Sequence, residues 1–176
     1  LLQSAGDRTI RGLLRFSPFG KGKESWLISL DLKNEEPIYG LGEKWASLNH
    51  RGQLIHSWNE DATTVNSELS YKNTPFAWSP EGWGLFVHTP SKVSHGVGYP
   101  QWSHRNYIIN LFDDELDLFF IAGESPKEII GAYTHLTGRA QQPPRWSYGM
   151  WMSRAYYLDA ESALEVAEGL VDHQIP

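Results

Sequence analysis

The sequence contains no cysteine in its 176 residues. This absence excludes disulfide bonds, thiol nucleophiles and thiolate metal sites together. Hydrophobic residues make up 40% of the sequence and charged residues 20%, so a packed globular core is expected. A protein without cysteine suits a reducing compartment, and we expect a cytoplasmic location.

Long apolar runs and clusters of basic residues are also absent. A transmembrane helix needs about 20 consecutive apolar residues, which the sequence does not contain. Its 15 Lys and Arg against 21 Asp and Glu give a net charge of −6. We therefore expect neither a membrane nor a nucleic acid as a partner. The chain begins with Leu1-Leu2 and not with Met, so we expect the natural N-terminus to lie upstream.

Sequence patterns of metal and cofactor sites are missing as well. None of the seven histidines forms a His-Glu-x-x-His motif or another spacing typical of metal ligands. Gly40-Leu41-Gly42 begins like a dinucleotide-binding motif, but it lacks the third glycine and a clear strand-to-helix junction. We predict no metal site and no cofactor.

Aromatic residues, by contrast, are abundant. Eight Trp, eight Tyr and seven Phe make up 13% of the sequence. Most of these rings are expected to fill a β-rich core. The others suit a surface that stacks on flat, weakly polar ligands, and sugar rings are ligands of this kind.

The first 124 residues have the pattern of short strands separated by turns. Strict alternation over 25–33 (SWLISLDLK) places Trp26, Ile28 and Leu30 on one face of a strand. The turns at 80–82 (PEG) and 113–115 (DDE) each separate two apolar segments, which predicts two β-hairpins. Such a pattern without a long helix indicates an antiparallel β-sandwich.

The pattern changes at Ser125, where a helix is predicted over 126–136. Ser125 can cap this helix, Pro126 suits its first position, and Glu128 completes a capping box. Gly138 is a typical residue for its end. We therefore place the boundary of a first domain, the β-sandwich with its terminal helix, at 1–138.

A linker is predicted at 139–145 because its two adjacent prolines interrupt both helices and central strands. The segment 146–153 (WSYGMWMS) suits a buried strand, and Asp159 can cap a helix over 160–173. One βα unit at 146–176 cannot close a sheet by itself, so we expect a truncated parallel α/β domain.

Acidic residues occur in two noteworthy pairs. The pair Asp113-Asp114 is most simply a solvated turn. The pair Glu60-Asp61 lies in a polar loop after Trp58, where contact with a ligand is the alternative to a purely structural role. Glycoside hydrolysis with retention needs two carboxylates about 5 to 5.5 Å apart, and the sequence alone does not show that any two converge.

Five motifs in a fixed order resemble those of family-31 glycoside hydrolases, the retaining α-glucosidases and α-xylosidases. The first two are YGLGEK at 39–44 and WNED at 58–61, which is similar to the family's W-N-x-D loop. The next two are YKNTPF at 71–76 and GWGLFV at 82–87. The fifth spans 137–151 and resembles the approach to the family's first barrel strand.

The resemblance implies a mainly β fold, in which an antiparallel β-sandwich precedes the first βα unit of a truncated (β/α)₈ barrel. In this family an aspartate nucleophile and an aspartate acid/base lie later in the barrel, beyond Pro176. We therefore assign no catalytic residue and expect the chain alone to be inactive. A homo-oligomer of the chain is left open as a further partner.

The resemblance further implies that the chain forms one wall of a sugar pocket. Asp61 corresponds to the aspartate of the family's W-N-x-D loop. Tyr156, or Tyr157 at one residue's shift in alignment, corresponds to an aromatic residue that lines the pocket after the first barrel strand. The implied partner is an oligosaccharide with terminal α-linked xylose or glucose. The alternative is a non-catalytic carbohydrate-binding or structural β-sandwich, which would end where its sandwich ends.

Overall fold

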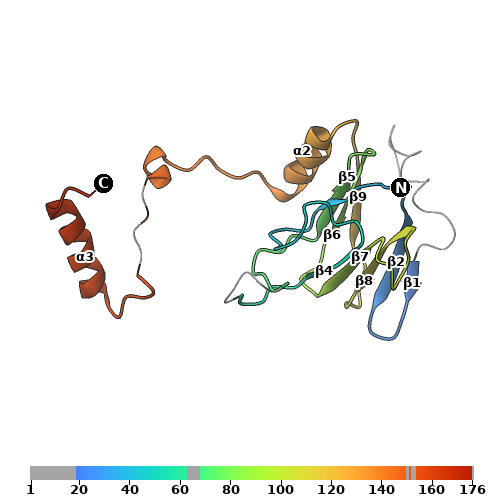
Figure 1. Cartoon of the computed structure of the whole chain (residues 1–176), viewed down its shortest axis with the longest axis horizontal. Helices are drawn as coiled ribbons and strands as arrows, with labels where there is room; N and C mark the ends of the chain where they lie inside the picture. Colours follow the sequence, from blue (N-terminus) through green and yellow to red (C-terminus); the bar gives the residue numbers. More distant parts are fainter. Residues whose placement is uncertain (1–18, 63–67, 150, 152–153, 176) are drawn as a thin grey trace. The chain divides into compact units, whose positions relative to one another are not determined.

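The computed structural model describes residues 19–62, 68–149, 151 and 154–175. The chain divides into two compact units, Leu1–Gly138 and Arg139–Pro176. The first contains every strand of the described chain and one α-helix, and the second contains a 3₁₀ turn and one α-helix (Figure 1).

One sheet of the first unit has five antiparallel strands in the order β1-β2-β8-β7-β4. The strands are β1 (Phe19–Lys21), β2 (Trp26–Asp31), β4 (Gln53–Ser57), β7 (Val93–Val97) and β8 (Asn106–Leu111). The other sheet has four antiparallel strands in the order β3-β5-β6-β9. These are β3 (Tyr39–Gly40), β5 (Phe76–Ser79), β6 (Trp83–Val87) and β9 (Leu118–Ala122).

Both sheets contribute to one hydrophobic core, which confirms the predicted antiparallel β-sandwich. Ile28 and Leu30 of β2 are fully buried there, together with Trp83 of β6. Leu27, between the alternating core positions, is 49% exposed. Burying one such large apolar side chain contributes about 1.5–3 kcal/mol, so the alternation of β2 determines which of its faces turns inward.

The first predicted hairpin is confirmed and the second is wrong. β5 and β6 pair across the turn at 80–82. β8 and β9, however, lie in different sheets. Both edges of β8 are already paired, one with β2 and the other with β7. The chain therefore crosses from one sheet to the other after β8, and β9 pairs with the free edge of β6 instead.

The predicted helix after Ser125 is confirmed as α2 (Pro126–Thr137). The Ser125 hydroxyl accepts a hydrogen bond from the Glu128 amide, and the Glu128 carboxylate accepts one from the Glu124 amide at 2.9 Å. Figure 1 shows α2 beside β5 and β9, where its fully buried Ile129 packs against Phe76. The helix thus covers the second sheet.

The second unit contains η1 (Arg145–Tyr148) and α3 (Ala160–Asp172). The predicted C-terminal helix is confirmed, with the Asp159 carboxylate accepting from the Ser162 amide at 2.8 Å. The predicted strand at 146–153 is wrong for 146–148, which form a 3₁₀ turn. Residues 150, 152 and 153 lie outside the described part of the chain.

The physical reason for this difference is the lack of a pairing partner. A parallel strand satisfies its backbone groups on neighbouring strands, and the described residues of the second unit include no strand. The backbone bonds locally instead, from the Ser147 amide to the Pro144 carbonyl at 3.0 Å. The start of a barrel in this segment stays a prediction. Among the described residues, no helix has the length and apolar character needed to cross a membrane.

Candidate functional site

The loop after β4 carries Trp58, Asn59, Glu60 and Asp61, the residues that the sequence singled out. Asn59 forms an isolated parallel bridge with Ser70, and the Glu60 amide donates to the Ser70 carbonyl at 3.0 Å. Asp61 is exposed. The backbone before Asp61 is therefore held in place while its carboxylate lies at the surface.

Asn73 is the centre of the hydrogen bonds that hold this loop. Its side-chain nitrogen lies 2.8 Å from the Trp58 carbonyl, 2.8 Å from the Ser70 carbonyl and 2.9 Å from Oδ1 of Asn59. Its side-chain oxygen accepts a hydrogen bond from the Ser70 hydroxyl at 3.1 Å. One amide side chain thus joins both ends of the segment that begins with Trp58.

Lys44 extends the same network to β4. Its ammonium donates to the His56 carbonyl at 2.6 Å and to the Ser70 hydroxyl at 2.9 Å. Burial lowers the pKa of Lys44, an effect that the carboxylates of Glu68 and Glu60 oppose. The hydrogen bonds run from Lys44 through Ser70 to Asn73 and on to Trp58, so they connect three motifs that are separate in the sequence.

The YGLGEK motif at 39–44 runs directly alongside the YKNTPF motif at 71–76. The Leu41 amide donates to the Phe76 carbonyl at 2.8 Å, and the Glu43 amide to the Lys72 carbonyl at 2.9 Å. Gly42 has φ +84°, and a Cβ there would lie 2.3 Å from the Lys72 carbonyl oxygen. This close approach of two backbones explains why the motif needs glycine at that position.

An open cleft of about 320 Å³ lies beside the loop. Its lining comes from the end of β4, from the Asn73 segment and from the connection between β6 and β7. The described lining residues are Ser57, Trp58, Asn59, Asn73, Pro75, Thr89, Pro90 and Ser91. All of these residues are uncharged, and the Trp58 side chain is 43% exposed.

Tyr156 and Tyr157 belong to the second unit. Tyr156 is 72% exposed and Tyr157 is 38% exposed. The Arg154 guanidinium lies over the Tyr157 ring, 5.4 Å from its centroid. Both rings are available to a ligand in this unit, while Asp61 belongs to the first unit. Their predicted role in binding substrate stays a prediction.

In the turn at Asp113-Asp114, Asp114 is exposed to solvent as expected, whereas Asp113 is hydrogen-bonded within the fold. The Asp113 carboxylate accepts a hydrogen bond from the Thr89 hydroxyl at 2.6 Å and one from the Glu115 amide at 3.2 Å. Bonds from Thr89, Glu115 and Ser91 lower the pKa of Asp113 to about 2. Asp113 therefore stays ionised and organises one side of the cleft.

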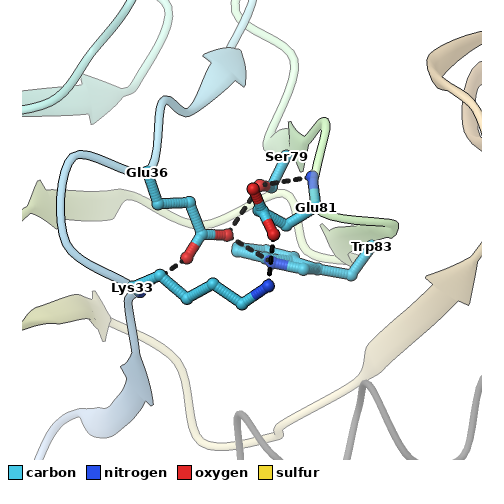
Figure 2. Close-up of polar contacts among 5 residues, drawn as sticks. All are labelled: Lys33, Glu36, Ser79, Glu81 and Trp83. Atoms are coloured by element: carbon cyan, nitrogen blue, oxygen red, sulfur yellow. Dashed lines mark hydrogen bonds and ion pairs between the residues drawn. The ribbon is translucent and has the colours of Figure 1, made fainter.

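A buried carboxylate that sequence reasoning did not single out is Glu36. Figure 2 shows its side chain between Ser79, Trp83 and the backbone of Lys33. One carboxylate oxygen accepts from the Ser79 hydroxyl at 2.6 Å and from the Trp83 indole at 2.8 Å, and the other accepts from the Lys33 amide at 2.7 Å. With both oxygens bonded inside the sandwich, Glu36 is a structural group.

His95 is another buried polar group of the first unit. Its Nδ1 lies 2.7 Å from the Tyr107 hydroxyl, and its Nε2 lies 3.1 Å from the Ser57 hydroxyl. Complete burial is the main cause that lowers the pKa of His95 to about 3. His95 is thus neutral near pH 7 and supports Ser57 from beneath the cleft. The described residues contain no cluster of three metal-ligating side chains.

Sequence reasoning identified the loop at 58–61 and missed the residues that hold it. In the linear sequence Asn73 and Lys44 are only single positions within two longer motifs. Asn is a common turn residue, which was the one available signal for Asn73. Nothing in the linear sequence pairs Asn73 with Trp58 or Lys44 with Ser70, because these contacts depend on the folded sandwich.

A family model describes residues 11–95 as a glycosyl hydrolase 31 N-terminal galactose mutarotase-like domain. An α-xylosidase of Emericella nidulans is 38% identical over 152 residues, which are 85% of this chain and 19% of that relative. The α-xylosidase XylQ of Lactiplantibacillus pentosus is 36% identical over 149 residues, 84% of this chain and 19% of that relative.

A similar solved structure is a GH31 dextranase of Flavobacterium johnsoniae, a mutant of which is complexed with isomaltotriose. It superposes with a TM-score of 0.78 at 31% identity, covering 90% of this chain and 20% of the dextranase. The chain thus spans about a fifth of the length of these relatives. The mutarotase-like sandwich, the order of its motifs and these likenesses agree, and the chain belongs to glycoside hydrolase family 31.

Proposed function

We propose that this chain is the N-terminal portion of a retaining α-glycosidase that removes terminal α-linked xylose or glucose from oligosaccharides. The observation that carries the proposal is the likeness to two α-xylosidases at 38% and 36% identity over more than four fifths of the chain. The dextranase complexed with isomaltotriose supports an α-linked oligosaccharide as the class of substrate.

The role proposed for the chain is to supply part of the sugar pocket and no catalytic carboxylate. Asp61 is exposed at the end of a loop whose base is pinned by Asn73. A carboxylate on such a loop can accept hydrogen bonds from sugar hydroxyls, and a hydrogen bond to a charged group is worth about 1.5 to 3 kcal/mol. Tyr156 and Tyr157 offer exposed aromatic rings, which suit the apolar faces of a sugar ring.

Two acidic groups of the first unit, Glu36 and Asp113, are held by hydrogen bonds within the fold. Glu36 is enclosed by Ser79 and Trp83 in the core. Asp113 is bonded to Thr89 and to the Glu115 amide. Neither is arranged as one of a pair of carboxylates flanking a glycosidic bond.

Activity measurements on two proteins test this proposal. The 176-residue chain and the longer enzyme that carries it are each incubated with p-nitrophenyl α-xyloside and p-nitrophenyl α-glucoside. We expect turnover by the longer enzyme only, and a heat-treated sample serves as the blank. Turnover by the chain alone would overturn the division of roles, and an inactive longer enzyme on both substrates would overturn the glycosidase assignment.

A further inference from the structure

The cleft beside Trp58 has the composition of a site for a neutral, hydroxyl-rich ligand. Its described lining contains hydroxyls, amides, prolines and one Trp but no charged side chain. A volume of about 320 Å³ is at the small end of ligand pockets, which begin near 300 Å³, so one or two sugar rings match it.

The Thr89 hydroxyl in the cleft lining is oriented by Asp113. Thr89 donates its proton to the Asp113 carboxylate at 2.6 Å. Thr89 Oγ1 in turn accepts from the Ser91 amide at 3.0 Å. A hydroxyl whose proton is engaged in this way presents an oxygen lone pair to a ligand. This part of the cleft therefore offers an acceptor to a hydroxyl proton of a sugar.

The lining also includes an aromatic ring and amide groups. Trp58 is 43% exposed, and its backbone is fixed by the bond from Asn73 to its carbonyl. An indole ring buries the apolar C–H face of a pyranose while its N–H can bond a hydroxyl. Because Asn73 and Asn59 are already held in one network, little ordering is needed when a ligand binds.

We propose that the cleft formed by Trp58, Asn73, Thr89 and Ser91 is a sugar-binding subsite on the sandwich itself, which holds one neutral pyranose ring stacked on Trp58. This inference rests on the proposed function only in its choice of xylose or glucose as the ligand. It differs from the role of Asp61, because Asp61 does not line this cleft and binding in the cleft needs no catalytic domain.

The test is a titration of the 176-residue chain followed by amide and indole NMR shifts. The probe is methyl α-D-xylopyranoside at up to about 50 mM, well above the dissociation constant on the order of 1 mM expected for one sugar ring. We expect saturable shifts of the Trp58 indole and of the Asn73, Thr89 and Ser91 amides. The absence of saturable shifts, or shifts confined to other residues, would overturn the proposal.

Variants make the test specific. Trp58→Ala is expected to raise Kd at least about tenfold, because it removes the stacking surface. Thr89→Val keeps the shape but loses the hydroxyl and is expected to raise Kd about 3- to 10-fold. Trp45→Ala is the matched control, since Trp45 is 73% exposed and does not line the cleft. Its Kd should stay within about twofold of the parent value, and an equal loss in Trp45→Ala would contradict the assignment.

A charged probe separates a sugar subsite from a general polar surface. Methyl α-D-glucuronide has a similar ring with an added carboxylate, and the ionised Asp113 lies behind the Thr89 hydroxyl that would face it. We expect it to bind at least about tenfold more weakly than methyl α-D-glucopyranoside. Equal binding of the two would overturn the proposal. If the longer enzyme is active and the chain binds no sugar, this inference fails while the proposed function stands.

Discussion

The side-chain nitrogen of Asn73 lies 2.8 Å from the carbonyl oxygen of Trp58. These two residues are 15 positions apart, and the bond joins the start of the loop to the segment that leads into β5. Asn73 also contacts Asn59 and Ser70, so a single amide closes the base of the loop. The loop can therefore present Asp61 from a fixed base although Asp61 itself is exposed.

Asp61→Asn in the longer enzyme should separate a binding role from a structural one. The substitution keeps the size and removes the charge, so we expect kcat/KM to fall about 10- to 150-fold. The melting temperature should barely change, because an exposed loop carboxylate contributes little to stability. Glu60→Gln, at the neighbouring exposed position, is the control. A lower melting temperature with normal kinetics would instead assign Asp61 to the loop structure.

Gly42→Ala should destabilise the first unit by about 3 kcal/mol or more, because the new Cβ would lie 2.3 Å from the Lys72 carbonyl oxygen. Gly52→Ala is a matched control, since Gly52 has a similar φ of +83° but a Cβ there would have no atom within 4 Å. At Gly52 we expect only the cost of placing alanine at a positive φ, about 1 kcal/mol. Chemical denaturation measures both, and equal losses would refute the role of the close approach.

His95 should make the fold less stable as the pH falls. The pKa of His95 is about 3 in the folded chain against 6.5 unfolded. In the folded state His95 thus stays neutral, whereas in the unfolded state it takes up a proton as the pH falls below 6.5. Between pH 7 and pH 5 this difference should remove about 2 kcal/mol from the free energy of unfolding.

Chemical denaturation at the two pH values measures this effect of His95. His95→Gln should reduce the pH dependence and leave the part due to His56, whose pKa burial also lowers, whereas substitution of the exposed His104 with Gln should leave the pH dependence unchanged. Should His95→Gln not fold, the parent chain and His104→Gln still test whether the free energy of unfolding falls between pH 7 and pH 5. A parent chain equally stable at pH 7 and pH 5 would contradict the prediction.

Glu36→Ala should be far more destabilising than Glu81→Ala. Removing the Glu36 carboxylate leaves the Ser79 hydroxyl, the Trp83 indole and the Lys33 amide without their acceptor, three of the contacts drawn in Figure 2. Each unsatisfied buried donor costs about 1–3 kcal/mol, and the bonds from Ser79 and Trp83 are buried, so a loss of at least about 2 kcal/mol is expected.

Glu81 is the control because its ion pair with Lys33 is largely exposed. Such pairs contribute about 0–1 kcal/mol. Thermal unfolding of the two variants gives the comparison. If Glu36→Ala unfolds at the same temperature as Glu81→Ala, the three donors must find other acceptors and the structural role of Glu36 is refuted.

The sequence predicted those parts of the fold that depend on neighbouring residues. The alternation of β2 identified Ile28 and Leu30 as core residues. The turn at 80–82 identified the β5–β6 hairpin, and Ser125 identified the start of α2. Each of these features follows from periodicity, turn chemistry or capping within a few residues.

The tertiary structure alone decided how the strands outside that hairpin pair and what holds the loop at 58–61. The turn at Asp113-Asp114 looks like a hairpin locally, yet β8 and β9 lie in different sheets because β2 and β7 already occupy both edges of β8. Residues 146–148 have the composition of a strand and form a 3₁₀ turn without a neighbour. The bond from Asn73 to Trp58 likewise needs the folded sandwich. Alternation along a strand determines which face is buried, whereas pairing depends on which edge remains free once the other strands have assembled.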